Sequence, residues 1–185
     1  MCTEREAAKR KPMIETTKAK AIAIAAVMLV MAGCSHTYVP KESKYSSERI
    51  PTYKVVAPVS LQNEQPRTEK VLFAANMGHK FYANYHDWTD KAIAIANREL
   101  VKRGAKTNGS NAHVLKLKVS SVQVTTGTWG FRGFVTLDAA LEDGSAKTLT
   151  GEAPGANIYN VASGALSAAI TKMLSDPEII AYLAK

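Results

Sequence analysis

The sequence is poor in cysteine and has no apolar run long enough to cross a membrane. Its 185 residues include only two cysteines, Cys2 and Cys34. The longest apolar run, residues 21–32, is shorter than the roughly 20 residues that a membrane-spanning helix needs. These shortages exclude this run as a transmembrane anchor, and they exclude a framework of several disulfides for the chain.

The sequence also lacks the motifs of common hydrolases and nucleotide-dependent enzymes. It has no glycine-rich loop followed by Lys-Ser or Lys-Thr, no Gly-x-Ser-x-Gly, no His-Glu-x-x-His and no cysteine pair with metal-ligand spacing. The net charge is +8, but no run of five or more basic residues exists to form a nucleic-acid-binding stripe. We therefore expect no catalytic residues, no cofactor, no metal and no nucleic-acid partner.

What the N-terminal part does contain is the three-part order of a secretory signal. Lys18 and Lys20 precede the apolar residues 21–32, and the small residue Gly33 stands just before Cys34. A basic segment, a short apolar segment and small residues at the end are typical of such signals. The alternative, a buried core helix ending at a free cysteine, is less favoured because a polar stretch with prolines follows.

The segment Met31-Ala-Gly-Cys34 resembles the lipobox of bacterial lipoproteins, Leu-Ala-Gly-Cys in its common form, and differs from it only at Met31. The resemblance implies cleavage between Gly33 and Cys34, a diacylglycerol on the Cys34 thiol and acylation of the new amino terminus. Ser35, in place of aspartate, implies transfer to the outer membrane, with the inner membrane as the alternative. Met13 would open a signal of more ordinary length, and we expect translation to start there.

The part that remains after cleavage is mildly basic and is expected to begin with a tether. Six of the 24 basic and three of the 16 acidic residues lie in residues 1–33, so 18 and 13 remain, with a net charge of +5. Residues 34–54 are mostly polar and include prolines, so they are predicted to form a flexible membrane tether. The ends of such a tether would lie about 25 Å apart. Residues 55–185 are then expected to form a single periplasmic domain with its own core.

Apolar periodicity and turn residues predict the elements of this domain. They are a strand over residues 54–61 with Pro58 at an edge, a helix over 87–103 capped by Asp87, three strands over 115–124, 133–142 and 147–153, a helix over 160–174 capped by Asn160, and a short helix over 178–184 capped by Asp176. Residues 71–75 fit either a strand or a helical turn. The apolar face switches across Ser120-Ser121, which predicts a β-bulge, and Asp143-Gly144 predicts a tight turn. The order predicts an α+β two-layer sandwich, an antiparallel sheet with two helices packed on one face.

The order of these features resembles that of the YajG-like envelope lipoproteins. The features are the lipobox, the polar segment, the helix ending at Arg103-Gly104, the bulged strand, the hairpin, and the small-residue helix before Asp176-Pro177. The resemblance spans most of the processed chain. It implies an envelope location and a fold rather than an activity.

Residues 127–134 are the first candidate for a binding site. They place three aromatic residues, an arginine and three glycines at a strand connection, and Trp and Arg are favoured at binding surfaces. The candidate partner-binding residues are Trp129, Phe131, Arg132 and Phe134. The alternative is that Trp129 and Phe131 cover the end of the core.

Residues 79–88 hold a second group of aromatic residues, Phe81, Tyr82, Tyr85 and Trp88. They fit either the lining of a groove for a glycan or an acyl chain, or a loop folded onto the sheet. The histidines are dispersed. Asp87 stands beside His86 and can orient its imidazole, but surface or capping roles are the expectation for such residues.

Together these features indicate a non-catalytic lipoprotein of the bacterial envelope that is anchored to the outer membrane, faces the periplasm and binds or organises an envelope protein partner. The alternative is a lipid- or lipopolysaccharide-binding subunit of a transport or assembly system, which needs an apolar groove. A third alternative, an envelope hydrolase, needs clustered titratable groups in a cleft.

We expect Cys34→Ser to abolish the lipid anchor, because the substitution removes the thiol that accepts the diacylglycerol. Each buried methylene of an acyl chain contributes about 0.8 kcal/mol, and more than one chain is needed for stable anchoring. Cell fractionation and intact mass should find the variant in a soluble or unprocessed form. Normal processing together with normal membrane retention of the variant would contradict the lipobox assignment.

Overall fold

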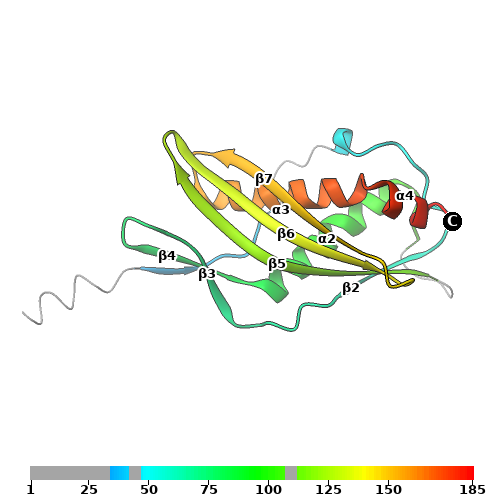
Figure 1. Ribbon diagram of the computed structural model, residues 1–185, viewed down its shortest axis with the longest axis horizontal. Helices are drawn as coiled ribbons and strands as arrows, with labels where there is room; N and C mark the ends of the chain where they lie inside the picture. Colours follow the sequence, from blue (N-terminus) through cyan, green and yellow to red (C-terminus); the bar gives the residue numbers. More distant parts are fainter. Residues whose placement is uncertain (1–33, 42–46, 107–111) are drawn as a thin grey trace, which may run out of the picture. The chain divides into compact units, whose positions relative to one another are not determined.

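The structure, a computed structural model, describes residues 34–41, 47–106 and 112–185, and the predicted signal, residues 1–33, lies outside the described residues. Ser35–Lys185 form one compact unit. Its elements in chain order are β1 (Ser35–Thr37), the 3-10 helix η1 (Ser47–Arg49), β2 (Val59–Asn63), β3 (Lys70–Asn76), β4 (His79–Asn84), α2 (Tyr85–Lys102), β5 (His113–Gly127), β6 (Gly130–Leu141), β7 (Ala146–Gly155), α3 (Ile158–Leu174) and α4 (Pro177–Leu183) (Figure 1). None of the helices in these described ranges is long and apolar enough to span a membrane.

The strands form two sheets. In the larger sheet the order is β2-β5-β6-β7, and β5, β6 and β7 are an antiparallel meander, as predicted. Its edge strand β2 follows Pro58 directly and pairs with β5 in parallel. This arrangement is possible because β3, β4 and α2 form the long crossover that parallel neighbours need. The smaller sheet has the order β1-β4-β3, so residues 71–75 belong to a strand. Residues 79–88, for which a folded loop was one of the two interpretations, form β4 and the first turn of α2.

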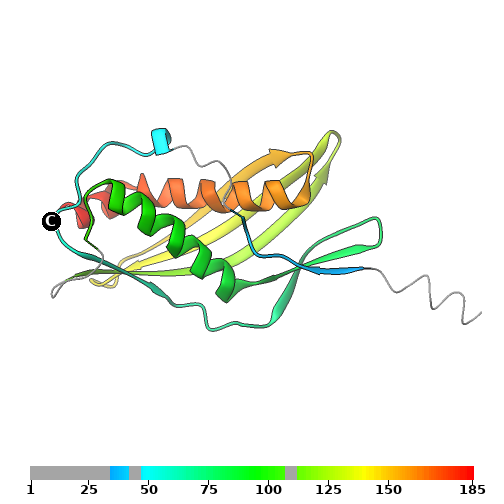
Figure 2. The ribbon, with the colours of Figure 1, turned by 180° about the vertical axis from the view of Figure 1, so that it is seen from behind.

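Helices α2 and α3 lie against one face of the larger sheet. Figure 2 shows both helices in front of the strands, and Figure 1, from the other side, shows the strands in front of the helices. The core between the two layers contains fully buried side chains such as Trp88, Leu117, Leu137 and Leu166. The structure therefore confirms the predicted α+β fold with helices packed on a sheet.

The predicted β-bulge is present in β5, where the register with β6 shifts between Val119 and Ser121. Beyond Leu117 this side of β5 has no strand neighbour, because β2 ends at Asn63, the partner of Leu117. Side chains bond the backbone there instead. The Val119 N–H donates to Thr89 Oγ1 at 2.9 Å, and the Gln65 amide donates to the Val119 carbonyl at 2.6 Å. Both polar side chains are buried, and both are satisfied.

Both long helices begin two residues before the predicted starts, and this corrects the two capping residues. The Asn84 side chain, not that of Asp87, accepts from the first free N–H groups of α2. Asn157, not Asn160, has this role in α3. Asparagine is among the best N-cap residues, so the signal was present three residues upstream in each case. Asp176 caps α4 with Pro177 in its first turn, as predicted.

The predicted tether over residues 34–54 differs from the structure in its first residues. Ser35–Thr37 form β1, which pairs in parallel with β4, and Tyr38 is buried. The backbone carbonyl of Tyr38 accepts a hydrogen bond from the Trp88 indole at 2.9 Å. The Tyr38 hydroxyl forms a hydrogen bond of 2.5 Å with Ser163 Oγ. The buried Tyr38 side chain thus attaches this otherwise polar segment to the core. The domain therefore begins at Ser35 rather than at residue 55.

The last part of the predicted tether is also packed on the domain. Ile50 is buried, and the Tyr53 ring lies 5.5 Å from the Arg103 guanidinium at the end of α2. Burial raises the pKa of the Tyr53 hydroxyl, and the Arg103 charge lowers it in part. The Val55 N–H donates to the Arg103 carbonyl at 3.0 Å. This segment is therefore bonded to the end of the helix opposite its capping Asn84.

Two glycines allow α3 to lie directly on the backbone of the sheet. A Cβ atom at Gly133 of β6 would lie 2.5 Å from the Val161 carbonyl oxygen. A Cβ at Gly151 of β7 would meet the Ala165 carbonyl oxygen and the Ala169 backbone, with its Cα at 2.8 Å. Small helix residues such as Ala165 and Ala169 are thus matched by glycines in the strands.

We expect Gly151→Ala to destabilise the domain by about 1–3 kcal/mol or more, because the added methyl group meets helix backbone that cannot move aside alone. Gly127→Ala is the matched control, since a Cβ there makes only an ordinary contact of 3.7 Å with the Gly130 carbonyl oxygen. Urea unfolding measures both free energies. Equal stability of the two variants would contradict the close packing.

Candidate functional site

The β5–β6 tip, residues 127–130, projects Trp129 into solvent. Thr128 and Trp129 form the turn between the paired residues Gly127 and Gly130. The Trp129 side chain is 97% exposed. Gly130 has a φ of +141°, and a Cβ there would lie 2.6 Å from the Gly155 carbonyl oxygen. The glycine therefore permits the close approach of β7 that stiffens the base of the turn.

An open hollow of about 410 Å³ lies beside this tip. Its side-chain lining comes mainly from Trp129, Phe131, Arg132 and Pro154. Three glycines and Ala156 form the part of the lining that has small or no side chains. Arg132 is the one ionisable group in the lining. An aromatic surface, a guanidinium and accessible backbone groups are suited to binding rather than to bond-breaking chemistry.

The structure brings three of the four candidate residues to this hollow. Phe131 is half-buried against the core, and Arg132 forms an exposed ion pair of 3.2 Å with Glu152. Such exposed pairs contribute little to stability, so the Arg132 guanidinium is available to a ligand. Phe134 is also half-buried and does not line the hollow. The alternative interpretation, in which both aromatic residues cover the end of the core, is wrong for Trp129 and holds for Phe131, which packs on the core.

The second aromatic group lies in the core. Phe81, Tyr85 and Trp88 are buried and Tyr82 is half-buried. The Tyr85 hydroxyl accepts from the Val122 N–H at 3.3 Å, next to the bulge of β5. These residues fill the space under the sheets and do not line a groove for a glycan or an acyl chain.

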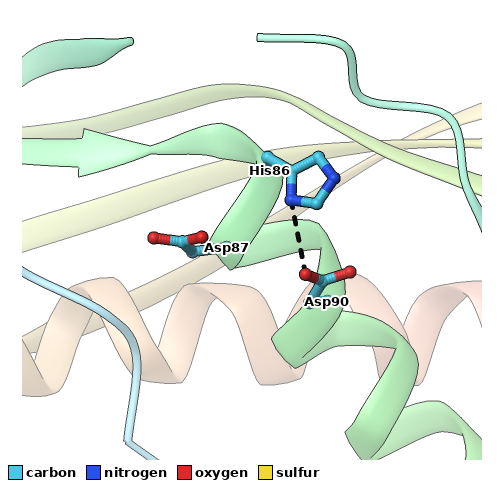
Figure 3. A group of neighbouring side chains, drawn as sticks. All are labelled: His86, Asp87 and Asp90. Carbon is cyan, nitrogen blue, oxygen red and sulfur yellow. Dashed lines mark ion pairs between the residues drawn. The ribbon is translucent and has the colours of Figure 1, made fainter. Parts of the chain in front are cut away.

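His86, Asp87 and Asp90 gather at the start of α2 (Figure 3). His86 Nδ1 lies 3.3 Å from Asp90, one turn further on, rather than bonding the adjacent Asp87. Asp90 also accepts from the Asn63 amide at 2.6 Å. The two carboxylates are at the helix N-terminus, where negative charge is stabilising without any ligand. The cluster is explained by helix capping electrostatics and is not assigned as a metal site.

The smaller sheet contains a pair of histidines that was not predicted from the sequence. His36 Nε2 and His79 Nδ1 are 3.0 Å apart, and the His36 ring stacks on Phe81 at 5.3 Å. The two residues are 43 positions apart, and only the β1–β4 pairing brings them together. A prediction of this strand pair would have been needed to find them.

In comparisons with known proteins, no family model matches the chain and no similar curated protein was found. The resemblance to YajG-like lipoproteins therefore stays a prediction.

We expect Trp129→Ala to change the free energy of unfolding by no more than about 0.5 kcal/mol, because its side chain is exposed and makes no core contact. Trp88→Ala, at a fully buried position, should cost about 3–5 kcal/mol. Urea unfolding of both variants makes the comparison. A large loss of stability from Trp129→Ala would assign this residue to the core.

Proposed function

We propose that this protein is a non-catalytic lipoprotein of the bacterial envelope, attached to the outer membrane through Cys34 and facing the periplasm. In this proposal the domain binds or organises an envelope protein partner through the β5–β6 tip. The observation that carries the binding role is the exposure of Trp129 beside the hollow. An exposed tryptophan next to an arginine is the composition of a binding hot spot rather than of an ordinary solvated surface.

The anchor is supported by the lipobox-like sequence and by the position of Cys34. Its thiol is free and exposed, as an acceptor of a lipid must be. The peptide bond to Ser35 joins it directly to β1. A lipid on Cys34 would therefore hold the folded domain at the membrane surface, without the tether that the sequence suggested.

The two alternative functions have weaker support. A lipid or lipopolysaccharide carrier needs an apolar groove, but the aromatic residues that suggested one fill the core. A hydrolase needs clustered titratable groups in a cleft, and the lining of the hollow contributes one arginine. Neither alternative is favoured by a specific contact among the described residues.

The partner-binding role is tested by photo-crosslinking in living cells. A photoreactive phenylalanine analogue at position 129 is expected to crosslink to an envelope protein, because this side chain would be covered by the partner. The matched control is the same analogue at Glu142, an exposed position beside the β6–β7 turn at the other end of β6.

The partner should no longer co-purify with Trp129→Ala protein that remains folded and acylated. Equal crosslinking from positions 129 and 142 would contradict a specific site, and so would the absence of any adduct at 129. Intact mass of the purified protein tests the acylation of Cys34 separately.

A further inference from the structure

The tip of the β3–β4 hairpin, residues 76–79, displays an apolar side chain at a conformational cost. Met77 is 91% exposed and has a φ of +46°. It is the one non-glycine residue with a positive φ in the described part of the chain. Asparagine or glycine is preferred at such a turn position, and methionine gains nothing from the fold there. Strain and apolar exposure at one residue point to a contact outside the domain.

This tip lies beside the point where the chain enters the domain. In the parallel pairing of β1 and β4, Ser35 lies opposite Lys80. Met77 lies in the turn before β4, three residues from Lys80, so at most about 10 Å of chain separates the two residues. The hydrogen bond between His36 and His79 holds the two segments together. A group attached to the residue before Ser35 therefore starts at the same end of the sheet as Met77.

The surroundings of the tip are suited to a lipid surface. Residues 35–41 and 70–84 contain no Asp or Glu, and Lys80 is exposed next to the tip. The headgroup region on each side of a bilayer is about 5–8 Å thick, and Met77 lies within about 10 Å of chain from the residue paired with Ser35, so its side chain can reach this layer. Methionine is flexible and apolar, which allows it to pack among acyl chains.

We propose that Met77 inserts into the lipid interface of the membrane that carries the anchor, with Lys80 against the headgroups, so that the domain is held by two points. This inference rests on the proposed function, because it needs the lipid on Cys34. The β5–β6 tip lies at the same end of the domain in both views, opposite the C-terminus (Figures 1 and 2). The second contact would thus fix the orientation in which Trp129 is presented beside the membrane.

Oxidation by hydrogen peroxide tests whether Met77 enters the membrane, and it needs no substitution in the β3–β4 tip. After cleavage at Cys34 the chain retains two methionines, Met77 and the fully buried Met173. The acylated protein is purified and reconstituted into vesicles of phosphatidylethanolamine and phosphatidylglycerol. The matched control protein carries ten additional Gly and Ser residues between Cys34 and Ser35, and the added segment begins with Ser. We expect Met77 to be oxidised several-fold more slowly in the original protein than in this control. The insertion separates the domain from the anchor by about 16–19 Å.

A second measurement uses quenching of tryptophan fluorescence by brominated acyl chains. In a Trp129→Phe background the remaining Trp88 is fully buried, so an added indole dominates the quenching. We expect strong quenching for Met77→Trp and none for Glu142→Trp, which lies near the opposite end of β6.

The outcomes separate the two proposals. Equal oxidation of Met77 with and without the insertion, or an unquenched indole in the Met77→Trp protein, would overturn the inference while the anchor stands. Absence of acyl mass on Cys34 would overturn the anchor itself. Met77 could also be protected from oxidation in the absence of lipid, but only when another protein is bound. This result would show that a protein covers the tip, and it would also overturn the inference.

Discussion

The backbone of α3 lies on the backbone of β6 and β7 because two strand residues have no side chain. At Gly133 and Gly151 the helix occupies the space that a Cβ atom would take. Side chains normally separate a helix from a sheet, so these glycines let α3 lie closer to the strands than side-chain packing would allow. Elements that are hydrogen-bonded to α3 depend on this position.

The entry of the chain is one of those elements. The first turns of α3 provide the Tyr159 carbonyl and the Ser163 hydroxyl, both of which bond the Tyr38 hydroxyl. The Tyr38 carbonyl in turn accepts from Trp88 of α2. A helix at a different height would move these partners away from Tyr38, and β1 would lose its support. The glycines of the large sheet thus position a strand of the small sheet.

Local signals made much of the large sheet predictable from sequence. The switch of apolar residues at Ser120-Ser121 marks the bulge because side chains alternate with a period of two, and Gly144, with a φ of +87°, marks the turn before β7. The helix starts were misplaced because Asn84 and Asp87 are both good capping residues. Tertiary contacts decide between them, since Tyr85 has to lie within α2 for its hydroxyl to bond β5.

The smaller sheet and the exposure of the two tips were beyond sequence reasoning. Strand β1 has three residues in a polar segment, and only its pairing with β4 and the burial of Tyr38 distinguish it from a linker. Trp129 and Phe131 are alike in sequence context, yet one is exposed and the other is half-buried. Alternation along β6 places Phe131 on the buried face only once the strand is known to extend back to Gly130, beyond the predicted start at residue 133.

The entry of the chain into β1 also governs how the domain would search for a partner. If Cys34 carries a lipid, a single peptide bond separates the lipidated residue from the first strand of the domain. The domain would then diffuse in the plane of the bilayer, and it would reach no further from the membrane than its own length. Encounter rates would depend on the density of partners per membrane area, and the effective concentration that a long linker provides would be absent. A partner deep in the periplasm would have to extend to the membrane itself.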